Sequence, residues 1–212
     1  MIVLAIDTCL AASSAAVIDG DRTLASRTEP MTRGHQEALG GIVRETVAQA
    51  GVAFAQLDRI AVTVGPGSFT GLRVGLAFAK GLAVALNIPC IGIGTLDALA
   101  EGRDGPRIVA IDAKKDQIYW RAFDDEHGLA DPAVLAASET AEIARGLLAG
   151  RRPLLIGTGS TLLAEHFPGA DIVDRPLADP AAVARLGAKA DPALAQPVPL
   201  YLRPPYATLP DA

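Results

Sequence analysis

The sequence predicts a two-lobed α/β protein in which one structural unit occurs twice. Residues 3–7 form an apolar run that ends in a carboxylate, and residues 108–112 repeat this pattern about half a chain later. Each run is followed by a short polar turn and a second predicted strand, at residues 14–19 and 117–124. A supersecondary pattern that recurs at a fixed offset indicates a duplicated architecture.

The boundary between the lobes is predicted at the loop-like residues 101–106. We therefore assign residues 1–103 to an N-terminal lobe that carries partner-binding helices. Residues 104–212 are assigned to a C-terminal lobe, with the option that its tail packs back on the first lobe. Half of the residues are hydrophobic and a fifth are charged, a composition typical of globular proteins.

The first lobe continues with a helix whose apolar positions recur every three to four residues and which Gly51 closes. An alternating strand, a glycine-rich turn, a second helix and a further strand follow it. These elements are predicted at residues 35–50, 58–64, 65–71, 72–86 and 89–94.

The second lobe is predicted to hold two further helices and a strand that runs into another glycine-rich turn. Its last helix begins at Asp179-Pro180, a cap residue followed by proline at the first helical position. The proline-rich residues 198–206 are predicted to be extended. The other elements are expected at residues 140–149, 154–156 and 161–167.

Bulk properties exclude several classes of protein. The net charge is −5, and neither half of the chain is basic enough to hold a phosphate backbone by itself. Cys9 and Cys90 are the only cysteines, which excludes a disulfide framework and a zinc cage. The start of the chain reads as a strand and no uninterrupted apolar run is long enough for a membrane helix, so we expect a cytoplasmic protein without membrane contact.

The helix at residues 72–86 has almost no polar face. Its only charged residues, Arg73 and Lys80, lie seven positions apart on one narrow side. Burial within the chain is one explanation, and a protein partner is the one we favour, because small residues recur every four positions and allow close backbone approach. We predict a partner interface formed by Ala38, Gly41, Glu45, Leu72, Gly75, Leu76, Ala79, Lys80 and Ala83.

Asp7 and Asp112 end equivalent strands and are expected to face each other across a cleft. Such a pair could hold Mg²⁺ and polarise a phosphate. A phosphate-binding turn needs glycine directly after the carboxylate, and neither turn has one. We therefore regard Asp7, Thr8 and Asp112 as vestigial phosphate-site positions and assign no firm cofactor-binding residue.

No catalytic or metal-binding residue is assigned. The turn at residues 65–71 lacks the Lys-Ser/Thr pair of a phosphate-binding P-loop. His35, His127 and His166 are far apart in sequence, and the serines Ser13, Ser14 and Ser68 have no obvious base.

Several motifs, in their order along the chain, resemble the TsaB (YeaZ) family of bacterial tRNA threonylcarbamoyladenosine biosynthesis proteins. The glycine-rich block is the most specific of them. The motifs are Ile6-Asp7-Thr8, His35-Gln36-Glu37, Gly65-Pro66-Gly67-Ser68-Phe69-Thr70-Gly71-Leu72-Arg73-Val74-Gly75, Ile111-Asp112-Ala113 and Tyr201-Leu202-Arg203.

This resemblance implies the duplicated ribonuclease H-like fold of actin, hexokinase and the Hsp70 ATPase. It also implies a non-catalytic subunit that pairs with its catalytic homologue TsaD and works with the ATPase TsaE. Alone, the apolar helix surface is expected to form a homodimer, and the acidic net charge indicates that tRNA is contacted mainly through the complex. The catalytic paralogue carries a His-x-x-x-His metal pair, and Thr95 and Leu99 occupy those two places here. No cofactor is implied for this subunit itself, although ADP or ATP at the partner interface stays open.

Smaller departures from the family pattern are Cys9, the pair Gly40-Gly41 and the lysines Lys114-Lys115, which stand where serine, a proline and arginine are common. Two alternatives also stay open. One is an active enzyme, either a sugar-kinase-like protein of the same fold or a metalloprotease-like protein. The other is a nucleotide-binding regulator.

Overall fold

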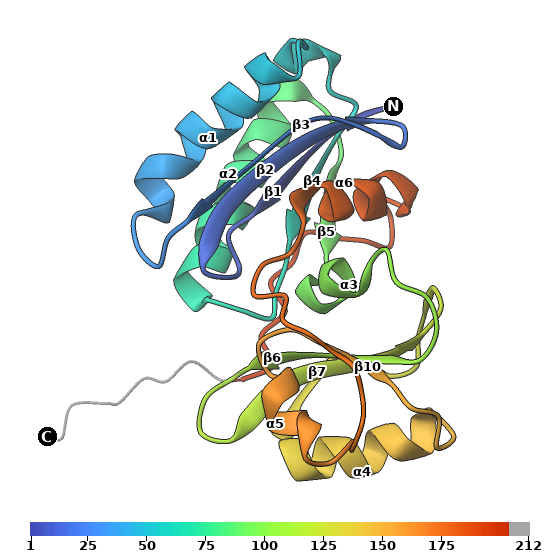
Figure 1. The fold of residues 1–212 in the computed structure, drawn as a ribbon. Helices are drawn as coiled ribbons and strands as arrows, with labels where there is room; N and C mark the ends of the chain where they lie inside the picture. Colours follow the sequence, from blue (N-terminus) through green and yellow to red (C-terminus); the bar gives the residue numbers. More distant parts are fainter. Residues whose placement is uncertain (204–212) are drawn as a thin grey trace, which may run out of the picture.

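Each lobe is built on a mixed sheet, and the two lobes are stacked one above the other (Figure 1). The computed structural model describes residues 1–203. The first sheet has the strand order β3-β2-β1-β4-β5, in which the β1–β2 and β2–β3 pairs are antiparallel and the others parallel. Its strands are β1 (Ile2–Asp7), β2 (Ala12–Asp19), β3 (Arg22–Pro30), β4 (Arg59–Thr63) and β5 (Cys90–Ile93).

The second sheet repeats this arrangement. Its order is β11-β10-β6-β7-β8. The β11–β10 and β10–β6 pairs are parallel, the β6–β7 pair is antiparallel, and β9 also pairs with β7. The predicted duplication is therefore confirmed. The strands are β6 (Arg107–Asp112), β7 (Gln117–Asp124), β8 (His127–Gly128), β9 (Ala133–Ala136), β10 (Leu154–Ile156) and β11 (Ile172–Val173).

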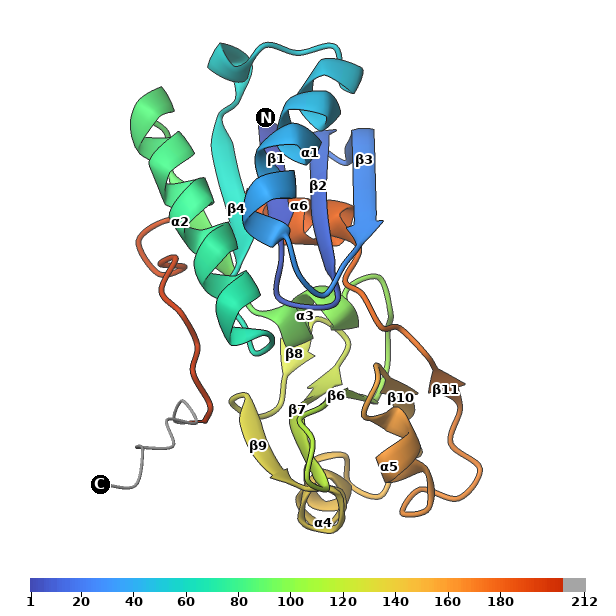
Figure 2. The same cartoon turned by 90° about the vertical axis from the view of Figure 1, so that its left-hand side faces the viewer.

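Helices cover both faces of the first sheet (Figure 2). Helices α1 and α2 pack on one face and α6 on the other, while α3 lies between the two sheets. Helices α4 and α5 cover the outer face of the second sheet. Their bounds are α1 (His35–Gln49), α2 (Phe69–Leu86), α3 (Thr95–Ala100), α4 (Ala137–Leu147), α5 (Ser160–Ala164) and α6 (Pro180–Lys189), with a short 3₁₀ helix, η1, at Phe54–Gln56.

One hydrophobic cluster joins the two lobes. Alternation along β1 directs Leu4 and Ile6 toward α1 and α2, and it directs Val3 and Ala5 toward the opposite face. The cluster on that opposite face contains all of the buried apolar residues of α3 and continues into β6, β7 and β10. Because the lobes share this core, they are not independently packed units.

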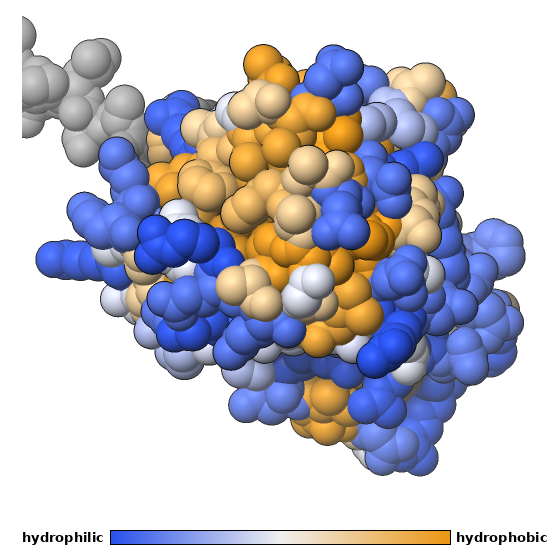
Figure 3. All heavy atoms as spheres, turned by 90° about the horizontal axis from the view of Figure 1, so that it is seen from above, coloured by the Kyte–Doolittle hydropathy of each residue, from blue (hydrophilic) through white to orange (hydrophobic). Residues whose placement is uncertain are grey.

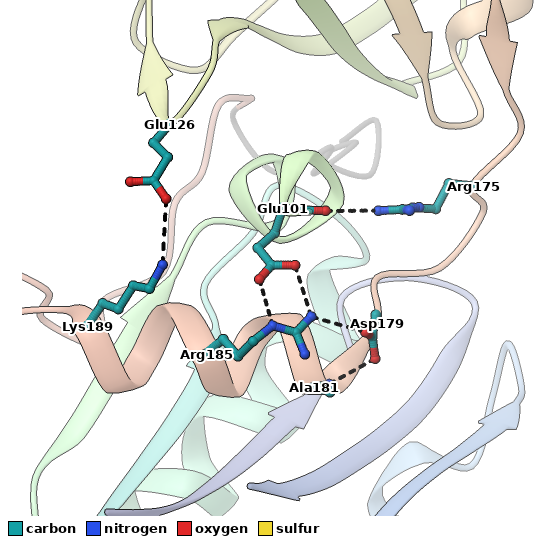
Figure 4. A network of polar contacts seen from close by, with 7 residues as sticks. All are labelled: Glu101, Glu126, Arg175, Asp179, Ala181, Arg185 and Lys189. Carbon is teal, nitrogen blue, oxygen red and sulfur yellow. Dashed lines mark hydrogen bonds and ion pairs between the residues drawn. The ribbon is translucent and has the colours of Figure 1, made fainter. Parts of the chain in front are cut away.

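Helix α6 packs on the first lobe, in line with the option that the end of the chain returns to it. It packs against β1, β2 and β4. Arg185 of α6 donates two hydrogen bonds to the carboxylate of Glu101, at 2.7 and 2.9 Å, just after α3 (Figure 4). Arg175 donates to the Leu99 carbonyl at 3.0 Å, so this network fastens the returning chain to the interlobe connection.

Several element ends differ from the predictions because side chains cap the helices. Helix α2 begins at Phe69 instead of Leu72, because the Ser68 hydroxyl accepts a hydrogen bond from the Gly71 amide. The predicted cap at Asp179 is confirmed. Strand β3 and helix α3 were not predicted. Residues 198–203 are non-helical as predicted, and the rest of that predicted segment lies outside the described residues.

Candidate functional site

Asp7, at the end of β1, is a buried carboxylate, and its side chain is only 1% exposed. Its Oδ1 accepts hydrogen bonds from the Thr63 hydroxyl at 2.6 Å and from the Cys9 amide at 2.9 Å. Burial raises the pKa of the Asp7 carboxyl, and the two hydrogen bonds oppose that rise. Asp7 therefore holds its own turn together, and the amide that could meet a ligand at Cys9 is already used.

Thr8 is also buried, and it explains two glycines of α2. Its hydroxyl donates a hydrogen bond to the Gly71 carbonyl at 2.7 Å. A Cβ at Gly71 would lie 2.0 Å from the Thr8 carbonyl oxygen, and one at Gly75 would lie 2.3 Å from the Thr8 hydroxyl. The small residues at this end of α2 thus admit the chain's own β1–β2 turn and not another protein.

The glycine-rich turn before α2 packs directly on the same segment. The Ser68 amide donates to the Cys9 carbonyl at 2.7 Å, and a Cβ at Gly67 would lie 2.1 Å from that oxygen. Burial raises the pKa of the Cys9 thiol to about 12. The Cys9 carbonyl therefore packs directly against this turn and leaves no room for a side chain at position 67.

Asp112 ends β6 in a more open setting than Asp7. Its carboxylate accepts hydrogen bonds from the Lys114 amide and the Lys114 ammonium, both at 2.7 Å. The hydrogen bond from the Lys114 side chain lowers the pKa of Asp112. Asp112 lines an interlobe groove, whereas Asp7 does not. The prediction that the two carboxylates face each other across this groove is therefore wrong.

The interlobe groove has a volume of about 380 Å³ and a polar lining that includes Thr32, Ser68 and Lys114. His35 lies on its wall, and the Nδ1 atom of His35 is 2.9 Å from the Ser13 hydroxyl. Sequence reasoning missed this Ser–His pair, because the two residues lie 22 positions apart and only the pairing of β2 with α1 joins them. Ser13 is fully buried, so its hydroxyl positions His35 and is not a reactive group at the surface.

The predicted partner-interface residues are divided between the buried and the exposed sides of α1 and α2. Five of them are in the core of the first lobe, because the small and leucine side chains form the inner face of α2; their assignment to a partner interface is corrected. These five are Leu72, Gly75, Leu76, Ala79 and Ala83.

The other four predicted interface residues lie at or near the surface. Glu45 and Lys80 are exposed, while Ala38 and Gly41 are half-buried. Around Gly41 there is open space, since a Cβ built there meets nothing within 4 Å.

The outer side of α2 is apolar. Val84 is 82% exposed, and the upper end of the first lobe shows a broad hydrophobic area (Figure 3). By length and composition alone, with a mean hydropathy of 1.4, α2 is the one helix among residues 1–203 that could cross a membrane. Its inner face packs on β4 instead.

Comparison with known proteins identifies the family. A family model described as "TsaD: tRNA N6-adenosine threonylcarbamoyltransferase" matches residues 23–147, more than half of the chain. The chain is 35% identical over 135 residues to the Escherichia coli protein named "tRNA threonylcarbamoyladenosine biosynthesis protein TsaB", and 36% identical over 123 residues to the Haemophilus influenzae protein of the same name. The chain belongs to the TsaB/YeaZ family.

The alignments cover part of each protein. With the E. coli TsaB protein, the match spans 61% of this chain and 58% of the relative; with the H. influenzae protein, it spans 55% and 51%. A Mycobacterium leprae relative is 41% identical over 63% of this chain, and only 38% of its own length is matched. The chain thus spans well under two thirds of these relatives.

Solved structures extend the match to nearly the whole chain. YeaZ from Pseudomonas aeruginosa is 26% identical, with a TM-score of 0.77 over 95% of this chain and 99% of that one. The Acidaminococcus fermentans (R)-2-hydroxyglutaryl-CoA dehydratase component A, at 10% identity and a TM-score of 0.53, shares the fold alone. The predicted actin/hexokinase-like fold class is confirmed.

Two motifs of the TsaB/YeaZ family that are distant in sequence meet at the lobe junction. The Arg73 Nε atom donates to the Tyr201 hydroxyl at 3.1 Å, and the rings of Phe69 and Tyr201 lie 5.2 Å apart. Arg203 donates to the Ala113 carbonyl of the second lobe. The segment at residues 191–203 therefore runs from α6 down to the second lobe as a strap (Figure 2).

Proposed function

We propose that this chain is a cytoplasmic, non-catalytic subunit of the system that makes threonylcarbamoyladenosine in tRNA, beside the anticodon. Membership of the TsaB/YeaZ family and the names of its bacterial relatives support this assignment. The subunit acts as partner and scaffold of the catalytic homologue TsaD, together with the ATPase TsaE.

The state of the β1 turn is the observation that carries the non-catalytic part of the proposal. Asp7 and Thr8 are each 1% exposed; the Asp7 Oδ1 atom accepts hydrogen bonds from Thr63 and Cys9, and the Thr8 hydroxyl donates to the Gly71 carbonyl. A carboxylate closed off in this way is not available to orient a phosphate or a metal-bound water.

Helix α3, which lies between the two lobes, also supports a non-catalytic role. Thr95 and Leu99 stand where the catalytic paralogue carries its histidine pair, and both side chains are fully buried in α3. Among residues 1–203, no group of three or more His, Cys, Asp or Glu side chains is placed to hold a metal ion.

The interface with the catalytic homologue is proposed on the outer sides of α1 and α2. Ala38, Gly41, Glu45 and Lys80 lie there, and the exposed Val84 adds an apolar centre. A large exposed apolar area of this kind is typical of interaction sites. The same surface accounts for a homodimer when the partner is absent, since a two-fold contact buries it against itself.

Two substitutions test the interface without disturbing the fold. Gly41→Glu places a side chain in open space, and Val84→Glu changes a residue that is 82% exposed. Leu194→Glu is the matched control, because Leu194 is 84% exposed after α6. Size-exclusion chromatography with the homologue should show loss of the complex for the first two variants only, with tRNA modification lost in parallel.

Complex formation by both variants at the wild-type level would refute the interface. A modification assay that proceeds equally well without this chain would refute the subunit role itself. The subunit role requires no cofactor in this chain; ADP or ATP at the partner interface is testable by calorimetric titration of ADP into the complex.

A further inference from the structure

Beside the interlobe groove lies a second hollow, the aromatic cavity, which is lined by Phe69, Tyr119, Tyr201 and Arg203 among others. Its volume is about 450 Å³, within the range of about 300–1,000 Å³ that small-molecule sites occupy. Residues of the strap, of the glycine-rich turn and of β7 line the aromatic cavity. The proposed subunit role leaves this cavity unexplained.

Aromatic rings are concentrated here beyond what the composition leads one to expect. The chain has five phenylalanines, three tyrosines and one tryptophan, and three of these nine rings line the one cavity. Phe69 and Tyr201 are 38% and 42% exposed, so much of their ring surface faces solvent. Exposed rings that converge on a hollow provide surfaces on which a flat apolar ring can stack.

Cations accompany the rings. The Arg73 guanidinium lies 3.7 Å from the centroid of the Phe69 ring, and that of Arg203 lies 5.6 Å from the centroid of the Tyr119 ring. The cavity thus combines aromatic rings with the Arg203 guanidinium, a pairing that suits a planar ring.

The aromatic cavity is continuous with the polar groove, because Gly67, Ala113 and Tyr119 line both. At the far side of this shared wall, the groove presents the Ser68 side chain and the Asp112–Lys114 ion pair, polar groups that can meet a sugar. An aromatic compartment that opens into a polar one matches a ring that carries a polar substituent.

We propose that the aromatic cavity binds a planar nucleobase, which stacks against Tyr119 and Tyr201. Base–aromatic stacking of this kind supports recognition of unpaired nucleotides. The base comes from a free nucleotide or from an unstacked position in an RNA loop. The second source rests on the proposed function, because it requires tRNA to reach this subunit.

The test is calorimetric titration of the full chain with three probes: AMP, ribose 5-phosphate and an anticodon stem–loop RNA. We expect AMP to bind at least tenfold more tightly than ribose 5-phosphate, which lacks the base. Tyr119→Leu should weaken AMP binding about tenfold, whereas Tyr119→Phe should retain it. Arg152→Ala, which removes a cation outside the cavity, is the charge control and should leave AMP binding unchanged.

Competition separates the two sources. RNA that displaces AMP, and that loses affinity with Tyr119→Leu, assigns the cavity to an RNA base; AMP binding without RNA binding assigns it to a free nucleotide. Equal affinity for AMP and ribose 5-phosphate, or AMP binding that is unchanged in Tyr119→Leu, would overturn the proposal. If Tyr119→Leu unfolds, the more exposed Tyr201→Leu takes its place.

Failure of this inference is distinguishable from failure of the proposed function. If the cavity binds no base, the chain can still be required for tRNA modification in the reconstituted complex. If modification does not require the chain, AMP binding to the cavity stands on its own calorimetric result.

Discussion

Gly75→Ala is the change that most directly tests which face of α2 is buried. The position lies on the inner face of the helix, over the β1–β2 turn, and a Cβ there would lie 2.3 Å from the Thr8 hydroxyl. Gly81, on the same helix, is exposed, and a Cβ there meets nothing within 4 Å. Gly75→Ala and Gly81→Ala therefore add the same methyl group, once where space is already filled and once where it is open.

The magnitude follows from two opposing effects. In a helix interior, alanine is more favourable than glycine by about 0.8–1 kcal/mol, and Gly81→Ala should gain an amount near this. Overpacking costs about 1–3 kcal/mol, and rotation of the Thr8 hydroxyl to relieve it breaks the 2.7 Å hydrogen bond to the Gly71 carbonyl. The two variants should thus differ in unfolding free energy by about 1–3 kcal/mol, with Gly75→Ala the less stable.

Urea unfolding of the isolated chain, followed by circular dichroism, measures both values. In a chain of 212 residues, this difference corresponds to melting temperatures about 2–12 °C apart. Thr8→Ala removes the clashing hydroxyl, so the cost of Gly75→Ala should shrink in that background. Equal stability of Gly75→Ala and Gly81→Ala, with additive effects of Thr8→Ala, would show that α2 does not pack as described.

Two further predictions concern titrating groups. Glu101→Gln should destabilise the chain by about 1 kcal/mol at neutral pH, because the hydrogen bond from Arg185 lowers the pKa of Glu101 in the fold. This stability is present above the unfolded pKa and is lost as pH falls through the folded one, so urea midpoints of the two proteins should converge as the pH falls below the ordinary glutamate value of 4.5. A constant gap would contradict the ion pair. Burial raises the pKa of Cys9 to about 12 and that of Cys90 to about 11. Iodoacetamide at pH 8 should therefore modify the fully buried Cys9 only after unfolding and the half-buried Cys90 slowly, as followed by mass spectrometry. Rapid loss of the Cys9 thiol in the native protein would contradict this placement.

The duplicated frame could be predicted from the sequence because it depends on local patterns. Strands with buried alternation, such as 3–7 and 108–112, and helix signals such as Asp179-Pro180 are visible in short windows. Strand β3 was missed because its residues are mostly polar and half-exposed, as suits the edge of a sheet.

The site was harder to predict because its contacts join distant segments. The apolar character of α2 was recognised, but which face is buried depends on Thr8, more than sixty residues earlier. The row Gly71, Gly75, Ala79 suits either a neighbouring helix or the chain's own turn, and spacing alone does not distinguish them. The Ser13–His35 pair and the convergence of Phe69 with Tyr201 likewise exist only after folding.

The return of α6 to the first sheet has a consequence for synthesis on the ribosome. Helix α6 supplies Ala181, Val183 and Ala184 to the face of the first sheet that α3 only partly covers. Translation delivers these residues after the entire second lobe, so that face of β1 and β4 stays bare while residues 107–173 are still emerging. A nascent chain stalled before residue 180 would expose this surface, and it is the form of the protein that most needs a chaperone.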